Sequence, residues 1–267
     1  PERFIDCGIA ECNMIGIAAG LSTCGKIPFA ASFAMFSAGR AFEQVRNSVG
    51  YPHLNVKIVG SHAGISVGED GATHQCCEDI ALMRTIPGMV VLNPADHYEM
   101  QAAVKAAAEY YGPVYIRLGR LAVESCNNND DYKFEIGKGI TLRDGKDITV
   151  IASGLMVGEA VKAVKALEAD GIDVRLIDMH TIKPLDRELV LKAAQETGRI
   201  VTVEEHNVIG GLGEAVASYL SEACPTPVIK IGVNDVFGHS GPAVDLLKEF
   251  GLSAENIEAT VKKALGK

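Results

Sequence analysis

The residues most capable of chemistry lie close together in residues 60–75. This stretch contains two histidines, two acids and four glycines: His62, His74, Glu69, Asp70, Gly60, Gly64, Gly68 and Gly71. It follows the apolar run 54–60, which predicts a buried strand, and precedes a helical pattern at 78–84. Glycine permits backbone conformations closed to other residues, so this loop can fold tightly around a small ligand. Polar side chains at a strand end indicate a binding or catalytic site; the alternative is a surface loop with incidental histidines.

Four more residues are candidates for such a site. Glu11 lies where a strand is expected to give way to a helix, which suits a helix cap as well as a catalytic acid. Phe33 and Phe36 are three apart at a strand end, as in a core pair or in a platform for a ligand. Arg120 follows a predicted strand and suits a phosphate contact or an ordinary exposed position. The residues alone leave these alternatives open.

Two later segments are rich in glycine and histidine. Residues 204–206 (Glu-Glu-His) end a predicted strand and precede 210–213 (Gly-Gly-Leu-Gly), which is similar to a dinucleotide-binding loop but short of a full G-x-G-x-x-G. Residues 238–241 (Gly-His-Ser-Gly) are similarly suggestive without a clear role. The sequence has no P-loop, G-x-S-x-G, H-E-x-x-H or C-x-x-C motif. We therefore predict no metal ligands in this chain.

The elements that must position these side chains alternate between strands and helices in residues 1–125. Short apolar runs predict strands, and apolar residues at helical spacing predict helices. The expected strands are 3–7, 28–33, 54–60, 89–93 and 114–118, and the expected helices are 11–21, 41–48, 78–84 and 98–110. This alternation predicts a mainly parallel sheet covered by helices on both faces.

A second unit of the same kind follows the polar run 127–131, which predicts a linker. Strands are expected at 148–152, 174–178, 200–204 and 228–231, and helices at 158–170, 186–197, 213–223, 243–250 and 254–265, the last capped by Ser253. We therefore predict an α/β protein of two domains, 1–125 and 141–267, joined by a linker at 126–140. Each domain is expected to have a mainly parallel sheet with helices on both faces.

Composition argues against several function classes. The chain has 267 residues, of which 48% are hydrophobic, and a net charge of −9. This charge argues against nucleic acid as a partner, whereas one or two local cations suffice for a small phosphorylated substrate. No run reaches the ~20 apolar residues of a membrane helix. Seven cysteines without a disulfide pattern favour a reducing cytoplasm. The first residue is Pro1, so we expect the natural chain to begin earlier.

Four segments together resemble transketolase, a thiamine-diphosphate enzyme of the pentose phosphate pathway. They are residues 8–14 (Gly-Ile-Ala-Glu-Cys-Asn-Met), 32–36 (Ser-Phe-Ala-Met-Phe), 62–75 and 118–120 (Leu-Gly-Arg). Their order and spacing match the family, and the resemblance covers the whole chain, as a pyrimidine-binding domain followed by the family's C-terminal domain. It implies transfer of a two-carbon ketol unit from a ketose phosphate to an aldose phosphate.

The same resemblance implies a partner. A complete transketolase also has a domain that binds the diphosphate through magnesium and carries a Gly-Asp-Gly motif, and this sequence has no Gly-Asp-Gly. The chain is therefore similar to the C-terminal subunit of a split transketolase. We expect the magnesium ligands on an N-terminal partner subunit and the active site between the two chains. Two copies of each would form a two-fold heterotetramer.

Cofactor contacts follow from the matching positions. Glu11 matches the catalytic glutamate that hydrogen-bonds a ring nitrogen of the aminopyrimidine, a role suited to a buried carboxyl with a raised pKa. Phe36 matches the aromatic residue that stacks on the pyrimidine, and Phe33 lines the same pocket. Cys12 and Gly39 depart from the family, in which Gln or His and an aromatic residue are common.

Substrate contacts are implied in the same way. His62 and Arg120 match contacts to the sugar phosphate, and Asp70 matches a contact to a donor hydroxyl. His74 matches a catalytic histidine that can hydrogen-bond oxyanion charge. The alternatives are the beta subunit of a 2-oxo-acid dehydrogenase, a deoxyxylulose-phosphate synthase, and a catalytically silent scaffold subunit. Retention of the site residues argues against the scaffold.

Overall fold

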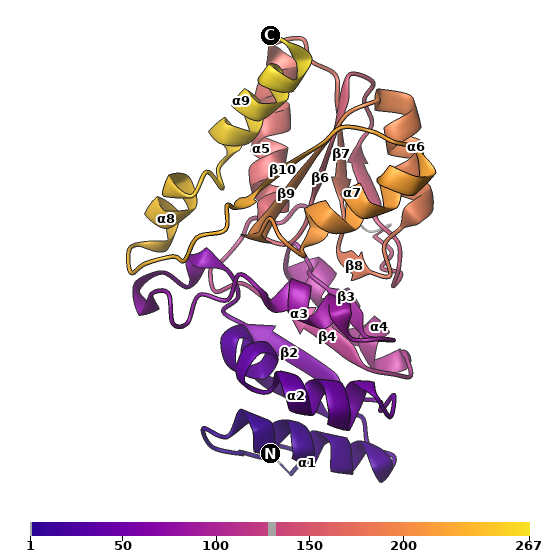
Figure 1. The fold of residues 1–267 in the computed structure, drawn as a ribbon, viewed down its shortest axis with the longest axis vertical. Helices are drawn as coiled ribbons and strands as arrows, with labels where there is room; N and C mark the ends of the chain where they lie inside the picture. Colours follow the sequence, from indigo (N-terminus) through magenta and orange to yellow (C-terminus); the bar gives the residue numbers. More distant parts are fainter. Residues whose placement is uncertain (1, 128–131) are drawn as a thin grey trace.

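The computed structural model describes residues 2–127 and 132–267 and contains two five-stranded sheets (Figure 1). The first sheet has the strand order β1-β2-β4-β3-β8. Its strands are β1 (Phe29–Phe33), β2 (Lys57–Ser61), β3 (Val90–Leu92), β4 (Val114–Arg117) and β8 (Thr181–Lys183). Neighbours pair in parallel except β3 and β8, which are antiparallel. Because β8 comes from the C-terminal half of the chain, both halves contribute to this sheet.

The second sheet has the order β10-β9-β6-β7-β5. Its strands are β5 (Ile140–Arg143), β6 (Ile148–Ala152), β7 (Val174–Asp178), β9 (Ile200–Asn207) and β10 (Val228–Val233). Pairing is parallel except between β5 and β7. The predicted α/β class with two mainly parallel sheets is confirmed. The domain boundaries stay a prediction, and residues 128–131 of the predicted linker lie outside the described residues.

Helices cover both faces of the first sheet. They are α1 (Glu11–Thr23), α2 (Phe42–Gln44), α3 (Asp79–Thr85) and α4 (His97–Glu109). Ala103 and Ala107 of α4 pack on one face, in a cluster with Val90 of β3. Val91 and Tyr115 point to the opposite face, where they join the cluster that includes α1 and α3. This split follows from the period of two along a strand, which sends successive side chains to opposite faces.

The second sheet is covered in the same way by α5 (Met156–Ala169), α6 (Arg187–Thr197), α7 (Leu212–Ala223), α8 (Ala243–Glu249) and α9 (Ala254–Leu265). Val150 of β6 packs toward α5, α8 and α9, whereas its neighbour Ile151 packs toward α6 and α7. One hydrophobic cluster includes α1 and α3 of the first layer as well as α6 and α7. The two sheets therefore share part of their core, and Figure 1 shows them stacked between α1 and α9.

A buried polar network also joins the two halves; we call Asp79, Arg117, Glu204, Glu205 and His206 the junction network. Arg117 pairs with Asp79 over 2.9 Å, with side chains 3% and 0% exposed. Arg117 Nη2 donates to the backbone oxygen of Glu205 over 2.7 Å. The charge of Asp79 is thus paired away from water, where an unpaired carboxylate is costly.

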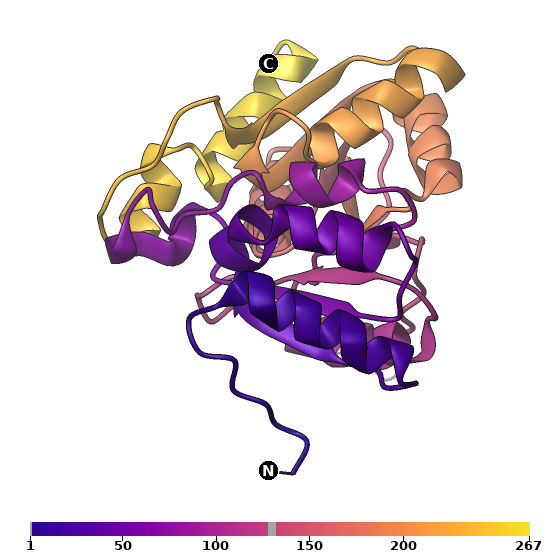
Figure 2. The same cartoon turned by 60° about the horizontal axis from the view of Figure 1, so that its bottom comes forward.

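Local predictions differ from the structure in three places. Residues 3–7, which lie within the described part of the chain, form no strand, and Figure 2 shows the N-terminal segment extending away from the body. The predicted helix 41–48 is the short α2 between two π-helical turns, η1 (Met35–Arg40) and η2 (Val45–Gly50). Strands β5 and β8 were not expected. Both are short and pair antiparallel with a strand distant in sequence.

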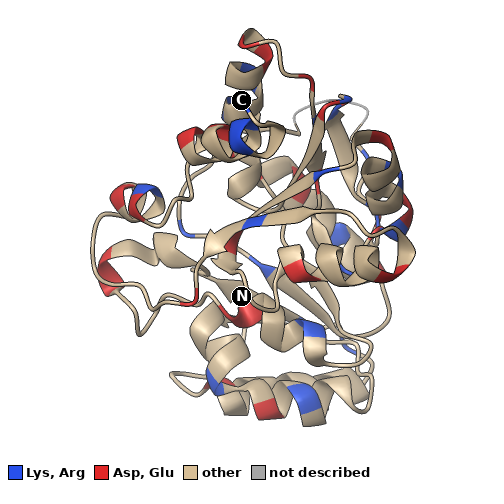
Figure 3. Ribbon diagram, turned by 45° about the horizontal axis from the view of Figure 1, so that its top comes forward, with Lys and Arg blue, Asp and Glu red and all other residues tan. Residues whose placement is uncertain are grey.

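The distribution of charged residues and the lengths of the helices agree with the expectations of no basic nucleic-acid surface and no membrane helix. In Figure 3 the acidic and basic residues lie on many different helices and strands, rather than in one basic region. Among the described residues, every helix is too short or too polar to cross a membrane.

Candidate active site

A partly buried carboxylate begins helix α1. Glu11 is the first residue of α1, and its side chain is 8% exposed. Ser32, in β1, donates from Oγ to Glu11 Oε1 over 3.1 Å. Arg40, the last residue of η1, donates from Nη1 to Glu11 Oε2 over 3.0 Å. Both carboxylate oxygens therefore have a partner, each from a different element.

The electrostatics of Glu11 correct one expectation. Burial alone would raise the pKa of its carboxyl, but hydrogen bonds from its own backbone N–H, Ser32 and Arg40, together with the charge of Arg40, hold the pKa below its ordinary value. The raised pKa expected from the sequence is therefore wrong for the chain as it stands. The lowering comes first from the hydrogen bonds of its own backbone N–H and of Ser32, and then from Arg40, which the sequence analysis did not place beside Glu11.

Four aromatic rings meet next to this carboxylate. Phe33 stacks on His62 with ring centroids 4.0 Å apart and an interplanar angle of 12°. Phe33 and Phe36 are nearly parallel, with centroids 6.2 Å apart. His74 and Phe36 are nearly perpendicular, with an interplanar angle of 86° and centroids 5.3 Å apart. The structure thus brings together four of the predicted site residues, and it leaves Phe33, Phe36, His62 and His74 only partly buried.

His62 is held in an unusual backbone conformation. Its φ is +54°, in the left-handed region that residues other than glycine seldom adopt. It directly follows β2, and its Nδ1 lies 3.0 Å from the hydroxyl of Ser61. Strained backbone of this kind is found mostly at functional sites. The strain and the stacking on Phe33 together fix where the imidazole lies.

The buried side chain of Gln75 holds the loop that carries Asp70 in place through hydrogen bonds. This loop includes a 3-10 segment, η3 (Ile65–Asp70), and the buried amide Nε2 of Gln75 donates to the backbone oxygens of Ile65, Gly68 and His239 over 3.0–3.3 Å. His239 belongs to the glycine-rich segment 238–241, whose role the sequence left open. The second half of the chain therefore holds the loop of the first in place.

Glycine is required at one point of this loop. Gly64 has φ +86°, and a Cβ there would lie 2.3 Å from the carboxylate of Glu205. That carboxylate accepts a hydrogen bond from the backbone N–H of Ser66 over 2.7 Å. The close approach lets Glu205, from the second sheet, anchor the start of η3.

Asp70 and Arg120 lie on the exposed rim of the site. Arg120 donates to the backbone oxygen of Val67 and pairs with Glu69 over 3.3 Å. Burial and then the charge of Arg120 lower the pKa of His62, while Asp70 opposes them. Both rim residues therefore lie within electrostatic reach of His62, although neither contacts the aromatic rings.

Sequence reasoning missed Arg40. Its guanidinium lies 4.6 Å from the centroid of the Phe36 ring as well as on Glu11. A usable signal did exist, because residues four apart on a helix are neighbours and Arg40 is four positions after Phe36. The contact with Glu11 had no such signal, since it depends on how η1 packs against α1.

The donor set fits a flat nitrogen heterocycle. Phe33 and Phe36 offer ring faces, and Glu11 offers a carboxylate that can share a proton with a ring nitrogen. These are the contacts that an aminopyrimidine ring needs. Within residues 2–127 and 132–267, no group of three or more His, Cys, Asp or Glu side chains is arranged to hold a metal ion.

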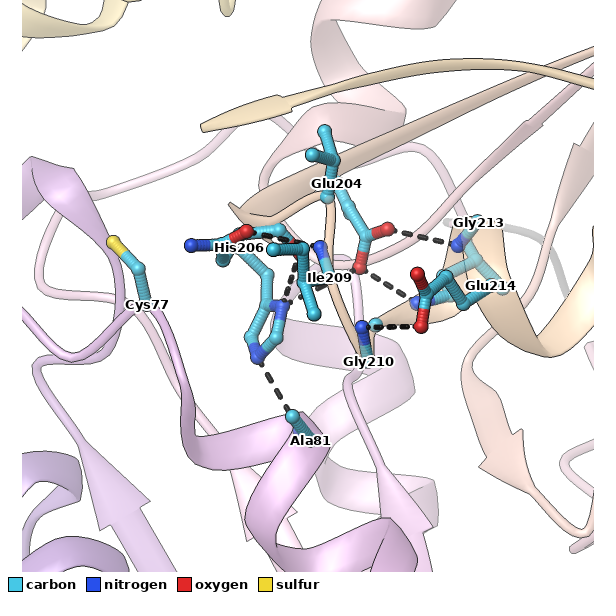
Figure 4. Close-up of polar contacts among 12 residues, drawn as sticks. Cys77, Ala81, Glu204, His206, Ile209, Gly210, Gly213 and Glu214 are labelled. Carbon is cyan, nitrogen blue, oxygen red and sulfur yellow. Dashed lines mark hydrogen bonds and ion pairs between the residues drawn. The ribbon is translucent and has the colours of Figure 1, made fainter. Parts of the chain in front are cut away.

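The second glycine-rich turn is not arranged to hold a phosphate (Figure 4). Glu204 accepts hydrogen bonds from the backbone N–H groups of Leu212 and Gly213 over 2.6 and 2.8 Å, so its own carboxylate occupies the N-terminus of α7. A Cβ at Gly211 would lie 1.9 Å from that carboxylate. Burial raises the pKa of Glu204 to about 7. The likeness to a dinucleotide loop therefore has a structural cause, which is capping of α7.

His206, next to this turn, is also structural. Its ring is fully buried, Nδ1 lies 2.7 Å from the backbone oxygen of Asn207, and Nε2 accepts from the backbone N–H of Ala81 over 3.3 Å (Figure 4). Burial lowers the pKa of His206 to about 4, so it stays neutral near physiological pH. A separate cavity of about 920 Å³ lies between β8, α6 and α7, and none of the predicted site residues lines it.

Comparison with known proteins gives a consistent result. Two family models match the chain: the transketolase pyrimidine binding domain over residues 1–125, and the transketolase C-terminal domain over residues 137–257. A putative transketolase C-terminal section of Methanocaldococcus jannaschii is 52% identical over all of this chain and 84% of its own length. A 6-deoxy-6-sulfo-D-fructose transketolase subunit of Clostridium sp. (strain MSTE9) is 48% identical over 96% of this chain and 80% of its own.

A solved structure agrees with these relatives. It is described as a split gene transketolase in an inactive beta4 tetramer, and it is 56% identical to this chain. The two superpose with a TM-score of 0.93, covering all of this chain and 85% of the other.

Proposed function

The chain belongs to the transketolase family, and from that premise we propose that it is the C-terminal subunit of a split, thiamine-diphosphate-dependent transketolase. The proposed reaction moves a two-carbon ketol unit from a ketose phosphate to an aldose phosphate. The observation that carries the proposal is that the guanidinium of Arg40 contacts both the Glu11 carboxylate and the ring face of Phe36, which places these two groups within reach of one flat ligand. This arrangement suits an aminopyrimidine ring, as described above.

We assign the cofactor contacts to three side chains. When bound, thiamine diphosphate supplies the electron sink that carbon–carbon transfer between sugars requires. Glu11 would hold a hydrogen bond to a pyrimidine ring nitrogen, and Phe36 would stack on the ring face, with Phe33 completing the wall. A partly buried carboxyl among apolar rings can share its proton more readily than one in water. Glu11 thereby acts as the acid–base residue of the site.

We assign the substrate contacts to the loop and its rim. The ring of His74 lies nearly perpendicular to that of Phe36. From this position an imidazole N–H would donate a hydrogen bond to negative charge that develops on a substrate oxygen. His62 and Arg120 would bind the anionic end of the sugar. Asp70, exposed at the end of η3, would accept a hydrogen bond from a donor hydroxyl. The charge coupling of His62 with both rim residues supports a shared binding region.

The anionic group on the substrate is proposed to be a phosphate. Arginine donates to tetrahedral oxyanions through two parallel N–H groups, which suits phosphate and sulfonate alike. The Clostridium relative is named for a sulfonated sugar, so substrates within this family differ in that group. A competition between the two anions at the same concentration would show which one this chain selects.

We further propose that the site is completed by a partner subunit. The magnesium and diphosphate contacts would come from that chain, which would carry the Gly-Asp-Gly motif, and two copies of each chain would form a two-fold assembly in the cytoplasm. The names of the relatives support a divided enzyme. The inactive beta4 tetramer named for the solved structure supports self-association of this type of subunit.

Reconstitution tests the proposal. Ketol transfer from xylulose 5-phosphate to ribose 5-phosphate would be measured with thiamine diphosphate and magnesium, for the chain alone and after addition of the Gly-Asp-Gly polypeptide. Activity is expected only after mixing, and Glu11→Gln should lower it about 10²–10⁴-fold. Turnover of 2-oxo acids instead of sugars would assign the chain to a 2-oxo-acid dehydrogenase. No turnover of either class would leave a scaffold subunit.

A further inference from the structure

Arg40 occupies both places that the proposed function gives to the pyrimidine. Its Nη1 donates to Glu11 Oε2 over 3.0 Å, the carboxylate oxygen that is not bound by Ser32. Its guanidinium carbon lies 4.6 Å from the centroid of Phe36, over the face of the ring. A guanidinium is flat, delocalised and rich in N–H donors, so it satisfies a carboxylate and an aromatic face simultaneously.

We propose that Arg40 is an internal occupant of the pyrimidine pocket, which a thiamine ring must displace from Glu11 and Phe36 in order to bind. The proposal rests on the function proposed above and adds a residue that the family resemblance did not assign. It gives Arg40 the role of a positioning residue that acts through Glu11.

The Arg40–Glu11 hydrogen bond satisfies a buried carboxylate oxygen when no ligand is bound. Glu11 is 8% exposed, and a carboxylate this deep is costly if one oxygen has no partner. Arg40 supplies that partner while no ligand is present. As long as it does so, Oε2 is not free to hydrogen-bond a ring nitrogen, and the hydrogen bond and charge of Arg40 add to the backbone N–H and Ser32 in lowering the pKa of Glu11.

Displacement is geometrically simple. The Arg40 side chain is 50% exposed, so its head group can turn into water without opening the core. Arg40 is the last residue of η1, a π-helical turn. Such turns are rare in proteins overall, but those that occur are often at functional sites. The next residue, Ala41, is fully buried and keeps the chain anchored. Only the side chain of Arg40 has to move.

The free energies allow a ligand to compete. A partly exposed ion pair together with one cation–π contact corresponds to roughly a threefold to tenfold effect on a binding constant. A ring that stacks on Phe36 and bonds Glu11 replaces both contacts. Arg40 therefore reduces the apparent affinity for the cofactor without preventing binding.

The test compares Arg40→Gln with a matched control, Arg46→Gln. Arg46 is an exposed arginine on the neighbouring turn η2 whose Nη1 bonds only Asn47. Two quantities would be measured: the pKa of Glu11 by carboxyl-carbon NMR of the full chain, assigned with Glu11→Gln, and the affinity of the reconstituted complex for thiamine diphosphate with magnesium by calorimetry. Arg40→Gln should raise the pKa of Glu11 and tighten binding about threefold to tenfold, and Arg46→Gln should change neither.

The outcomes separate this inference from the proposed function. Equal or weaker binding by Arg40→Gln, while Glu11→Gln loses binding, would overturn the inference and leave the proposed function intact. Weaker binding would in addition make Arg40 a residue that holds the ligand. An unchanged Glu11 pKa in Arg40→Gln would also overturn it. Failure of every protein, the parent included, to bind the cofactor would reject the proposed function and the inference with it.

Discussion

The Glu11 site and the junction network contain the same kinds of residues, but they differ in what satisfies them. At the junction, Arg117 pairs with Asp79, Glu204 binds two backbone N–H groups and His206 binds two backbone atoms, all out of contact with water. At the site, Glu11 is held by a hydroxyl and by the half-exposed Arg40.

This difference distinguishes acids that stabilise the fold from an acid that can bind a ligand. The junction partners are backbone N–H groups or the buried side chain of Arg117, which cannot leave without local unfolding, so the junction acids are fixed in one arrangement. Side-chain partners such as Arg40 can leave, so the carboxylate of Glu11 can exchange them for a ligand. The ring faces of Phe33 and Phe36 are partly exposed as well, whereas the junction network has no open face. Glutamate, histidine and glycine in a loop are therefore informative only together with the partners that the fold gives them.

Removing the acid at Glu11 should have the largest effect on activity and little effect on stability. Glu11→Gln keeps the size of the side chain but loses the proton that the role requires. We expect ketol transfer by the reconstituted enzyme to fall about 10²–10⁴-fold. The thermal midpoint of the chain should stay within a few degrees, because Arg40 can still donate to the amide oxygen while the amide NH2 donates to Ser32 Oγ. A stable variant with full turnover would show that Glu11 has no acid–base role.

Breaking the junction pair should have the opposite profile. Arg117→Leu leaves the fully buried Asp79 without its cation, and we expect the free energy of unfolding to fall by about 3–5 kcal/mol. Denaturant titration of the chain alone would measure this. The double variant Asp79→Leu/Arg117→Leu is the matched control, since removing both charges should recover part of the loss. Equal losses in the single and double variants would show that packing, and not charge, is what Arg117 provides.

The junction should also produce a pH dependence opposite in sign to that of the Glu11 carboxyl, whose pKa is lowered. The pKa of Glu204 is raised from 4.5 to about 7 by burial, so the folded state favours the protonated acid. Its contribution is therefore complete below about pH 4.5 and is lost as the pH rises through 7, by about 3 kcal/mol at most. Glu204→Gln should flatten this part of the stability profile, measured by denaturant titration from pH 5 to 8. Glu214→Gln, a half-exposed acid in the same turn, should leave it unchanged.

The smallest effect is expected at the rim of the site. Arg120→Ala removes an exposed cation that would bind the sugar phosphate, and KM for the donor should rise about tenfold with little change in kcat. Arg120→Lys should lie between the two, because lysine keeps the charge but loses the fork of donors. Steady-state kinetics with varied xylulose 5-phosphate would show this. A fall in kcat at constant KM would show that Arg120 takes part in the chemical step and not only in binding the sugar phosphate.

Much of the fold was predictable from local pattern. Central strands such as β6 and β7 are continuous apolar runs, and Ser253 caps α9 as predicted, with its Oγ accepting from Asn256. The strands that pattern missed, β5 and β8, are short and are defined by antiparallel partners distant in sequence. Residues 3–7 failed for the reverse reason: Phe4 and Ile5 favour a strand locally, but they are 78% and 53% exposed and have no sheet to join.

The site was predictable in its parts but not in its contacts. Spacing and motif indicated Phe33, Phe36, His62 and His74, and the structure brings these rings together. Their roles, like those of Glu11, Asp70 and Arg120, stay proposals until tested. The lowered pKa of Glu11 could not be predicted, because it depends in part on contacts with Ser32 and Arg40, which are distant in sequence.

The crossing of β8 into the first sheet has a consequence during protein synthesis. Strand β3 is complete once Leu92 has been made, but its antiparallel partner, β8, is made only at Thr181–Lys183. Until that stretch leaves the ribosome, β3 is an open edge with unpaired backbone groups, the kind of surface on which nascent chains associate wrongly. The first sheet can therefore be completed only after several strands of the second sheet have been synthesised. We expect the two sheets to fold together in the cell.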